Sequence, residues 1–348
     1  MKKNFISSLV ALVLLVGLTT SLGYGQRRRS SSSSNSSATP AASQALSGPL
    51  AALPASDAVM LIDIKRLLND AAPRVLGNDP ARLAKWNAHI EQFKTQYGLD
   101  VRSFEQLAVG LRFQSPRAGV TTTDMIAIVH GTFNSGALLA AGRMAAKGKY
   151  QEEKYRNSTI YIFDVNDKVK MGGLFDMNVK QLAVAALDAN TLVFGEPEGV
   201  RSTIGGSRER KRINTELIQM ALRNPNAVIS FGANVPQSAT QGKDFGNDEI
   251  NKNLASIRQA YGALGLTPEG FDLTAIARTE RADQAKALGD TLSALKQFGG
   301  MFVSQLPPEK GKMAQAAIDS LSITTAGNET QIRLALAQAA INELMRNL

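Results

Sequence analysis

The stretch Gln-Ile-Arg-Leu-Ala-Leu, residues 331–336, alternates apolar and polar side chains. In a strand, Ile332 and the two leucines fall on one face, while Gln331 and Arg333 fall on the other. One apolar face and one polar face are typical of an antiparallel sheet that is buried on one side. The stretch therefore predicts antiparallel strands, and helical segments elsewhere in the chain make the expected fold class α+β, a mostly antiparallel sheet packed with helices.

This stretch is the second strand of a predicted hairpin, and a predicted helix follows it. The same arrangement occurs earlier in the chain. Near the C-terminus, two strands within residues 321–336 precede a helix over 339–348. In the middle of the chain, two strands within residues 182–194 precede a helix over 197–204. The two segments resemble an internal repeat.

Two interpretations of this repeat stay open. The chain consists of two related α+β halves, about residues 49–213 and 214–348, or the match is a coincidence, because hairpins followed by helices are common. A folded part of about 300 residues can form one large core or two smaller ones. The sequence therefore predicts a boundary near residue 213 without deciding between one domain and two.

The clearest helix is predicted over residues 80–97. Asp79 can cap its N-terminus, and Pro80 suits the first helical position. Apolar side chains recur every three or four residues and form one stripe, and Gly98 can end the helix. The stripe consists of Leu83, Trp86, Ile90, Phe93 and Tyr97.

Other segments show weaker patterns of the same two kinds. Further helices are predicted over residues 135–146, 248–263, 282–298 and 310–320, with Gly299-Gly300 ending the third of them. Further strands are predicted over residues 59–63, 108–113, 125–130, 160–164, 227–232 and 271–277.

The N-terminus predicts export. Lys2 and Lys3 precede an apolar run over residues 9–18, and small residues follow up to Gly25. This order is typical of a secretory signal peptide. The run is shorter than the roughly 20 residues of a membrane-spanning helix. We therefore expect a leader over residues 1–25 and a periplasmic or extracellular protein that has no transmembrane segment once the leader is removed.

Residues 26–48 predict a disordered linker rich in arginine and serine, because almost no large apolar side chain occurs there. Of the 39 basic residues, two lie in the leader and three in this linker, so 34 basic residues stand against 30 acidic ones in the rest. Such a mild excess does not indicate a nucleic-acid partner. The chain has no cysteine, so disulfides and thiolate metal sites are excluded.

Several short segments follow one another in an order known from a family. They are Leu53-Pro-Ala-Ser-Asp57, Tyr97-Gly-Leu-Asp100 before Phe104-Glu105, Tyr155-Arg-Asn-Ser-Thr-Ile160, and the hairpin over 182–194 with Glu198-Gly-Val200. Over residues 53–235 the chain resembles an uncharacterised family of exported bacterial proteins with Leu-Pro-Ala-Asp, Gly-Leu-Asp and Tyr-x-Gly segments. Ser56 is an insertion relative to that pattern, and Asn157 replaces a glycine. The resemblance implies an exported α+β protein and supplies no catalytic residue.

Motifs that would indicate catalysis or metal binding are missing. His89 and His130 have no second histidine or carboxylate at a metal-ligand spacing. Ser293 and Lys296 have the Ser-x-x-Lys spacing of some acyl-transferases, but the accompanying Lys-Thr-Gly is absent. We therefore expect no catalytic, cofactor-binding or metal-binding residue.

Three further segments favour turns or loops over ligand sites. In Asp164-Val-Asn-Asp167, the sixth and twelfth positions of a calcium loop would be Val169 and Phe175, which cannot fulfil those roles. A turn is expected there. The glycine pairs at 172–173 and 205–206 lack the spacing of phosphate loops. The basic run over 207–212 has no neighbouring aromatic residue and predicts a solvated loop.

These observations favour an exported, non-enzymatic envelope protein that binds an unidentified protein or cell-wall polymer and needs no cofactor. Two alternatives stay open. The first is a carrier that holds an apolar small molecule or lipid between sheet and helices. The second is a hydrolase whose catalytic residues are dispersed along the sequence.

Overall fold

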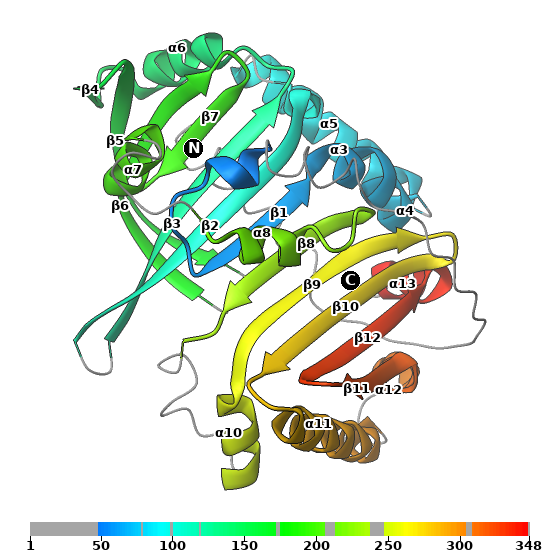
Figure 1. Ribbon diagram of the computed structural model, residues 1–348. Coiled ribbons are helices and arrows are strands. Elements are labelled where there is room, and N and C mark those ends of the chain that lie inside the picture. The colour runs from blue at the N-terminus through cyan, green and yellow to red at the C-terminus, as the bar shows by residue number, and fades with distance from the viewer. Residues whose placement is uncertain are drawn as a thin grey trace, which may run out of the picture. The chain divides into compact units, whose positions relative to one another are not determined.

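The computed structural model describes residues 48–77, 79–97, 100–117, 120–171, 175–205, 213–236, 247–303 and 308–346 (Figure 1). Helices pack on strands that are all paired antiparallel in the described registers, so the predicted α+β class is confirmed. The predicted leader over residues 1–25 and the predicted linker up to residue 47 lie outside the described residues, as do the basic run 207–212 and the glycines at 172–173 and 206.

The chain divides into two compact units. The described part of the first comprises residues 48–70, 79–97, 100–117, 120–171, 175–205 and 213–218, and that of the second comprises residues 71–77, 219–236, 247–303 and 308–346. The chain passes from the first unit to the second within α8 (Thr215–Ala221). The relatedness of the two predicted halves stays a prediction.

An antiparallel sheet forms the centre of the first unit. In order across the sheet, its strands are β1 (Ala58–Asp63), β2 (Phe104–Arg117), β3 (Val120–Gly131), β7 (Thr191–Gly195), β6 (Phe175–Asp188), β5 (Ser158–Met171) and β4 (Gln151–Tyr155). Its helices include α3 (Ile64–Arg66), α5 (Pro80–Tyr97), α6 (Ser135–Ala146) and α7 (Pro197–Gly205), and short helical turns lie at η1 (Pro49–Ala52), η2 (Leu67–Ala71) and η3 (Val101–Ser103).

The middle of this sheet is buried on both faces. Residues 126–129 of β3, 182–185 of β6 and 191–195 of β7 are almost inaccessible to solvent. α6 and α7 pack against β6, and Val200 of α7 is fully buried. This unit therefore has a filled core.

Two predicted helices of the first unit are confirmed, and so is the predicted Asp79 cap of the first of them. The Asp79 carboxylate accepts a hydrogen bond from the Arg82 amide at 3.0 Å at the start of α5. Ile90 of the predicted stripe is buried, and Trp86 is half-buried. The side chains of Phe93 and Tyr97, and Gly98, lie outside the described part. In α6, Asn134 accepts from the Ala137 amide at 2.8 Å and caps the helix.

The second unit contains antiparallel strands of its own. In order across the sheet they are β11 (Leu321–Ala326), β12 (Glu329–Ala337), β10 (Gly270–Thr279), β9 (Ile257–Thr267) and β8 (Ala227–Asn234). Its helices are α4 (Ala72–Leu76), α10 (Asp248–Ala255), α11 (Ala282–Val303), α12 (Pro308–Ser320) and α13 (Gln338–Arg346). Both predicted hairpins, within 321–336 and within 182–194, are confirmed, and so are the helices that follow them.

The helix predicted over residues 248–263 is wrong beyond Ala255. β9 begins at Ile257 and pairs with β8 and β10. Gly262 explains the change, because a Cβ built on it would lie 2.2 Å from the Thr274 carbonyl oxygen of β10. The close approach of two strands at this glycine overrides the local helical pattern.

The predicted stop of α11 at Gly299-Gly300 is also wrong, because the helix continues to Val303. A Cβ on Gly299 would lie 3.5 Å from the Ile318 side chain of α12, so the glycine lies beside the neighbouring helix. Packing against α12 offsets the roughly 1 kcal/mol by which a helical glycine is less favourable than alanine.

The turn predicted at Asp164–Asp167 is a third error. These residues lie inside β5, and the pairing of β5 with β6 is irregular between Asp164 and Asp167. A bulge thus explains the local accumulation of Asp and Asn in a long strand. The short edge strand β4 was not predicted.

The burial of α11 gives a test of this packing. Leu288 is fully buried, whereas Leu295 on the same helix is 43% exposed. We expect Leu288→Ala to lower the free energy of unfolding by about 2–5 kcal/mol, because a cavity remains, and Leu295→Ala to lower it by less than about 1 kcal/mol. Urea unfolding followed by circular dichroism measures both. Equal losses would contradict the described orientation of the helix.

Candidate ligand-binding face

The sheet of the second unit has two faces of different chemistry, because consecutive side chains in a strand point to opposite faces. On one face, register partners form two adjacent rows. The first row consists of Phe231, Gly262, Ala275, Ile332 and Ile323. The second row consists of Ile229, Leu264, Leu273, Leu334 and Leu321. We call these two rows the apolar face.

The large side chains of the apolar face are only half-buried, and Leu273 is 38% exposed. The neighbouring row is different. Its Thr330 is fully buried and donates a hydrogen bond to the Ala285 carbonyl of α11 at 2.7 Å. α11 therefore covers one end of this side of the sheet and runs along β11, while the large side chains of the apolar face keep part of their surface exposed to solvent. Apolar surface that stays accessible in a folded protein can mark an interaction site.

The second half of α11 carries further exposed apolar side chains. Leu295, Phe298 and Met301 are 43%, 56% and 59% exposed, and their spacing of three places them on adjacent turns. The first half of the helix is held by α10, because the Asn253 amide donates to the Thr291 hydroxyl at 2.8 Å. The exposed residues lie beyond this contact along α11.

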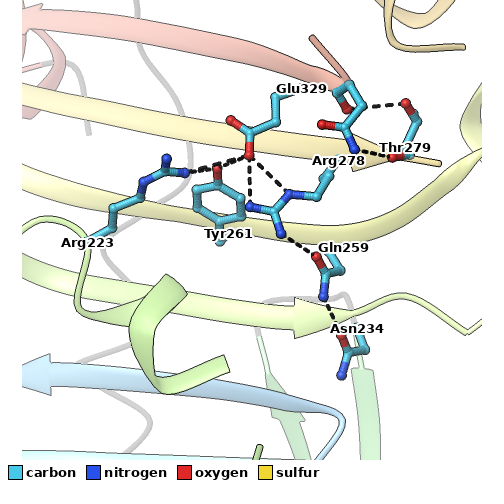
Figure 2. A network of polar contacts seen from close by, with 8 residues as sticks. Arg223, Asn234, Gln259, Tyr261, Arg278, Thr279 and Glu329 are labelled. Atoms are coloured by element: carbon cyan, nitrogen blue, oxygen red, sulfur yellow. Dashed lines mark hydrogen bonds and ion pairs between the residues drawn. The ribbon is translucent and has the colours of Figure 1, made fainter. Parts of the chain in front are cut away.

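The opposite face of the sheet carries a polar network that crosses four strands (Figure 2). Asn234, Gln259, Arg278 and Glu329 are register partners on β8, β9, β10 and β12. Gln259 donates to the Asn234 side-chain oxygen at 3.1 Å, and Arg278 donates to Gln259 at 2.8 Å. Arg278 Nε and Nη2 donate to Glu329 Oε1 at 3.0 and 2.9 Å.

Tyr261 joins this network from the middle of the sheet. Its hydroxyl donates to Glu329 Oε1 at 2.8 Å and accepts from Arg223. The guanidinium groups of Arg223 and Arg278 lie 5.0 and 5.6 Å from the centroid of its ring. Burial acts to raise the pKa of Glu329, but hydrogen bonds from Tyr261 and Arg278 outweigh it and hold that pKa below its ordinary value. The network therefore stabilises the ionised carboxylate and fixes the strand register.

Two interacting carboxyl groups, Glu196 and Asp124, lie in the first unit. Glu196 precedes α7, and Asp124 of β3 pairs with Arg112 of β2 at 3.1 Å. Burial and the neighbouring Asp124 carboxylate raise the pKa of Glu196 above its ordinary value, and Arg112 offsets this only in part. The Glu196 carboxyl group therefore keeps its proton to a higher pH in the folded state than in the unfolded state.

The histidines and the Ser-x-x-Lys spacing singled out in the sequence do not come together. His89 is exposed on α5, and the Nδ1 atom of His130 lies 3.0 Å from the Thr191 hydroxyl oxygen. Ser293 and Lys296 both lie on α11, where the Lys296 ammonium donates to the Leu321 carbonyl at 2.5 Å. This contact ties the helix to the first residue of β11.

Within the described ranges, no group of three or more histidine and acidic side chains is arranged to hold a metal ion. Among the helices of the same ranges, none has both the length and the apolar composition of a bilayer-spanning segment. The absence of assigned site residues stays a prediction from the sequence.

Sequence reasoning missed the apolar face, although part of its signal was present. The sequence predicts strands at Leu273, Ile332 and Leu334 in a sheet packed with helices, but it does not show which part of the sheet stays accessible. Ala260, Gly262, Leu264 and Leu266 alternate with the residues between them, and this pattern could have revealed β9. The accessibility of the face depends on where α11 lies, which no local pattern indicates.

No protein-family model and no curated protein matches this chain. Solved structures that are similar include crystal forms I and III of TP0453, at 8% and 10% sequence identity with TM-scores of 0.43 and 0.42. Both cover 86% of this chain, and 97% and 98% of TP0453 respectively. This distant likeness carries no argument about function, and the resemblance to the exported family stays a prediction.

Stability at low pH tests the role of Glu329. Because the folded-state pKa lies below the ordinary value of 4.5, its stabilising contribution is present above that pH and is lost as pH falls through the folded pKa. We expect Glu329→Gln to be less stable than the wild type at pH 7, by a difference that shrinks on acidification. Urea unfolding across this range measures it, with Glu269→Gln as an exposed control. A constant difference would contradict the assignment.

Glu196 predicts the opposite pH dependence. Its folded-state pKa lies above the ordinary value, so the stability gained from the bound proton is present below that value and lost as pH rises through the folded pKa. We expect Glu196→Gln to be more stable than the wild type at pH 7 and equally stable at low pH. Thermal unfolding at several pH values measures this, and a loss of stability at pH 7 would refute it.

Proposed function

We propose that the protein is exported and acts without catalysis by holding an apolar molecule on the apolar face of its second unit. The accessibility of this face carries the proposal. Its two rows consist of hydrocarbon side chains, apart from one glycine, and solvent reaches part of the surface of the large ones. Covering apolar surface is favourable by about 25 cal/mol per Å². An apolar ligand that covers these side chains is therefore bound by the hydrophobic effect.

The chemistry of the face favours a carrier over a protein that binds a wall polymer. A polysaccharide presents hydroxyl groups, and the side chains of Ile229, Leu264, Leu273 and Leu334 offer no hydrogen-bond partner to them. A long hydrocarbon chain needs no such partner. The expected periplasmic or extracellular location fits this role, because an apolar molecule requires a carrier in water.

A protein partner in the cell envelope is a second candidate, favoured by the exposed side chains of α11. Phe298 and Met301 are more than half exposed, and aromatic and methionine side chains are common in the centres of protein interfaces. Such a partner would bind the helix and would not require the apolar face.

Native mass spectrometry of the protein, expressed with its own leader and purified without detergent, separates these candidates. A chain that begins at Gln26 and carries a bound small molecule supports the exported carrier. If every preparation gives the mass of the protein alone, or of a complex with another protein, the carrier hypothesis is contradicted. A mass that includes residues 1–25 contradicts export with cleavage of the leader.

Substitution of Leu273 locates the ligand. We expect Leu273→Glu to weaken binding of the neutral fluorophore N-phenylnaphthylamine by about tenfold or more, because a carboxylate on this face would have to be desolvated. The matched control is Thr324→Glu, an exposed position of β11 that points to the opposite face of the same sheet. Fluorescence titration measures both. Equal affinity of the two variants, or no binding by the wild type, would refute the assignment.

A further inference from the structure

The second row of the apolar face ends beside a cation, and this placement, which rests on the proposed function, indicates the kind of ligand. Leu321 is the last residue of the row, opposite Leu334. The Leu321 carbonyl accepts a hydrogen bond from the Lys296 ammonium at 2.5 Å. A hydrocarbon row and a positive charge therefore meet at one edge of the sheet.

The length of the row suits an extended chain. It crosses β8, β9, β10, β12 and β11, and adjacent strands lie about 4.8 Å apart, so it extends for about 19 Å from Ile229 to Leu321. Leu273 is the most exposed of its members, at the middle of the row. A long aliphatic chain laid across the strands would contact each of these side chains in turn.

The Lys296 ammonium is not paired with a carboxylate in the described part of the chain. Among the described residues, the Leu321 carbonyl is the hydrogen-bond acceptor of Lys296, and no carboxylate pairs with it. Asp319, the acidic residue nearest to Leu321 in the sequence, accepts a hydrogen bond from Gln315 at 2.8 Å instead. An ammonium has three donors, and a carboxylate is the partner that best uses those remaining.

We propose that the ligand is a long-chain fatty acid, with its hydrocarbon chain along the second row and its carboxylate on Lys296. A single ammonium matches a single negative charge, whereas phosphate groups usually recruit arginine pairs or helix N-termini. The head group would approach from the edge strand β11, and the chain would extend towards β8.

Competition against bound N-phenylnaphthylamine tests this with palmitate and hexadecanol, which differ mainly in the charge of the head group. We expect the wild type to bind palmitate about tenfold or more tightly than hexadecanol, since a hydrogen bond to a charged group is typically worth that factor. Lys296→Gln should remove the preference by weakening palmitate alone. Lys286→Gln, an exposed lysine on the same helix, should keep the preference, and so should Lys296→Arg.

The outcomes separate this inference from the proposed function. If palmitate and hexadecanol bind the wild type equally, or if Lys296→Gln weakens both, the fatty-acid assignment is wrong while the carrier remains. If neither displaces the fluorophore and the fluorophore itself does not bind, the proposed function fails as well. Sedimentation with phosphatidylglycerol vesicles, without saturable binding of palmitate, would indicate a membrane surface and overturn the inference.

Discussion

The register of β8, β9, β10 and β12 is the constraint on which the second unit depends. Side chains alternate along each strand, so a shift of one residue would exchange the polar and apolar faces. The Glu329 carboxylate opposes such a shift, because it binds Arg278 and Tyr261 from two neighbouring strands. The polar network thus determines which side chains reach the apolar face, although it lies on the other side of the sheet.

The two units both pack helices on an antiparallel sheet, but they bury the apolar side chains of the sheet to different extents. In the first unit, helices pack on a sheet whose central strands are buried on both faces, so the apolar side chains of these strands lie in the core. In the second unit, α11 covers the row of Thr330 and extends along β11, as the contacts of Gly289 and Lys296 show. The position of one helix therefore decides whether the hydrocarbon side chains form a core or an accessible surface.

The sequence predicted the elements better than it predicted the face they build. Alternation over 331–336 predicted the strand β12, and the spacing of apolar residues around Ile90 predicted the helix α5, because both patterns depend on local sequence alone. β9 was missed because the approach of β10 to Gly262 is a long-range contact, and α11 was ended too early because Ile318 lies far along the chain. No motif revealed Lys296 as a ligand candidate, since its position beside Leu321 arises only when α11 lies along β11.

The partly exposed apolar face also affects how the stability of this unit depends on temperature. The heat capacity of unfolding is set mainly by the apolar surface that becomes hydrated, and part of that surface is already hydrated in the folded state around Leu273. The second unit should therefore have a smaller heat-capacity change for its size than the first. Its stability curve is correspondingly flatter, and covering the face with hydrocarbon makes the curve steeper.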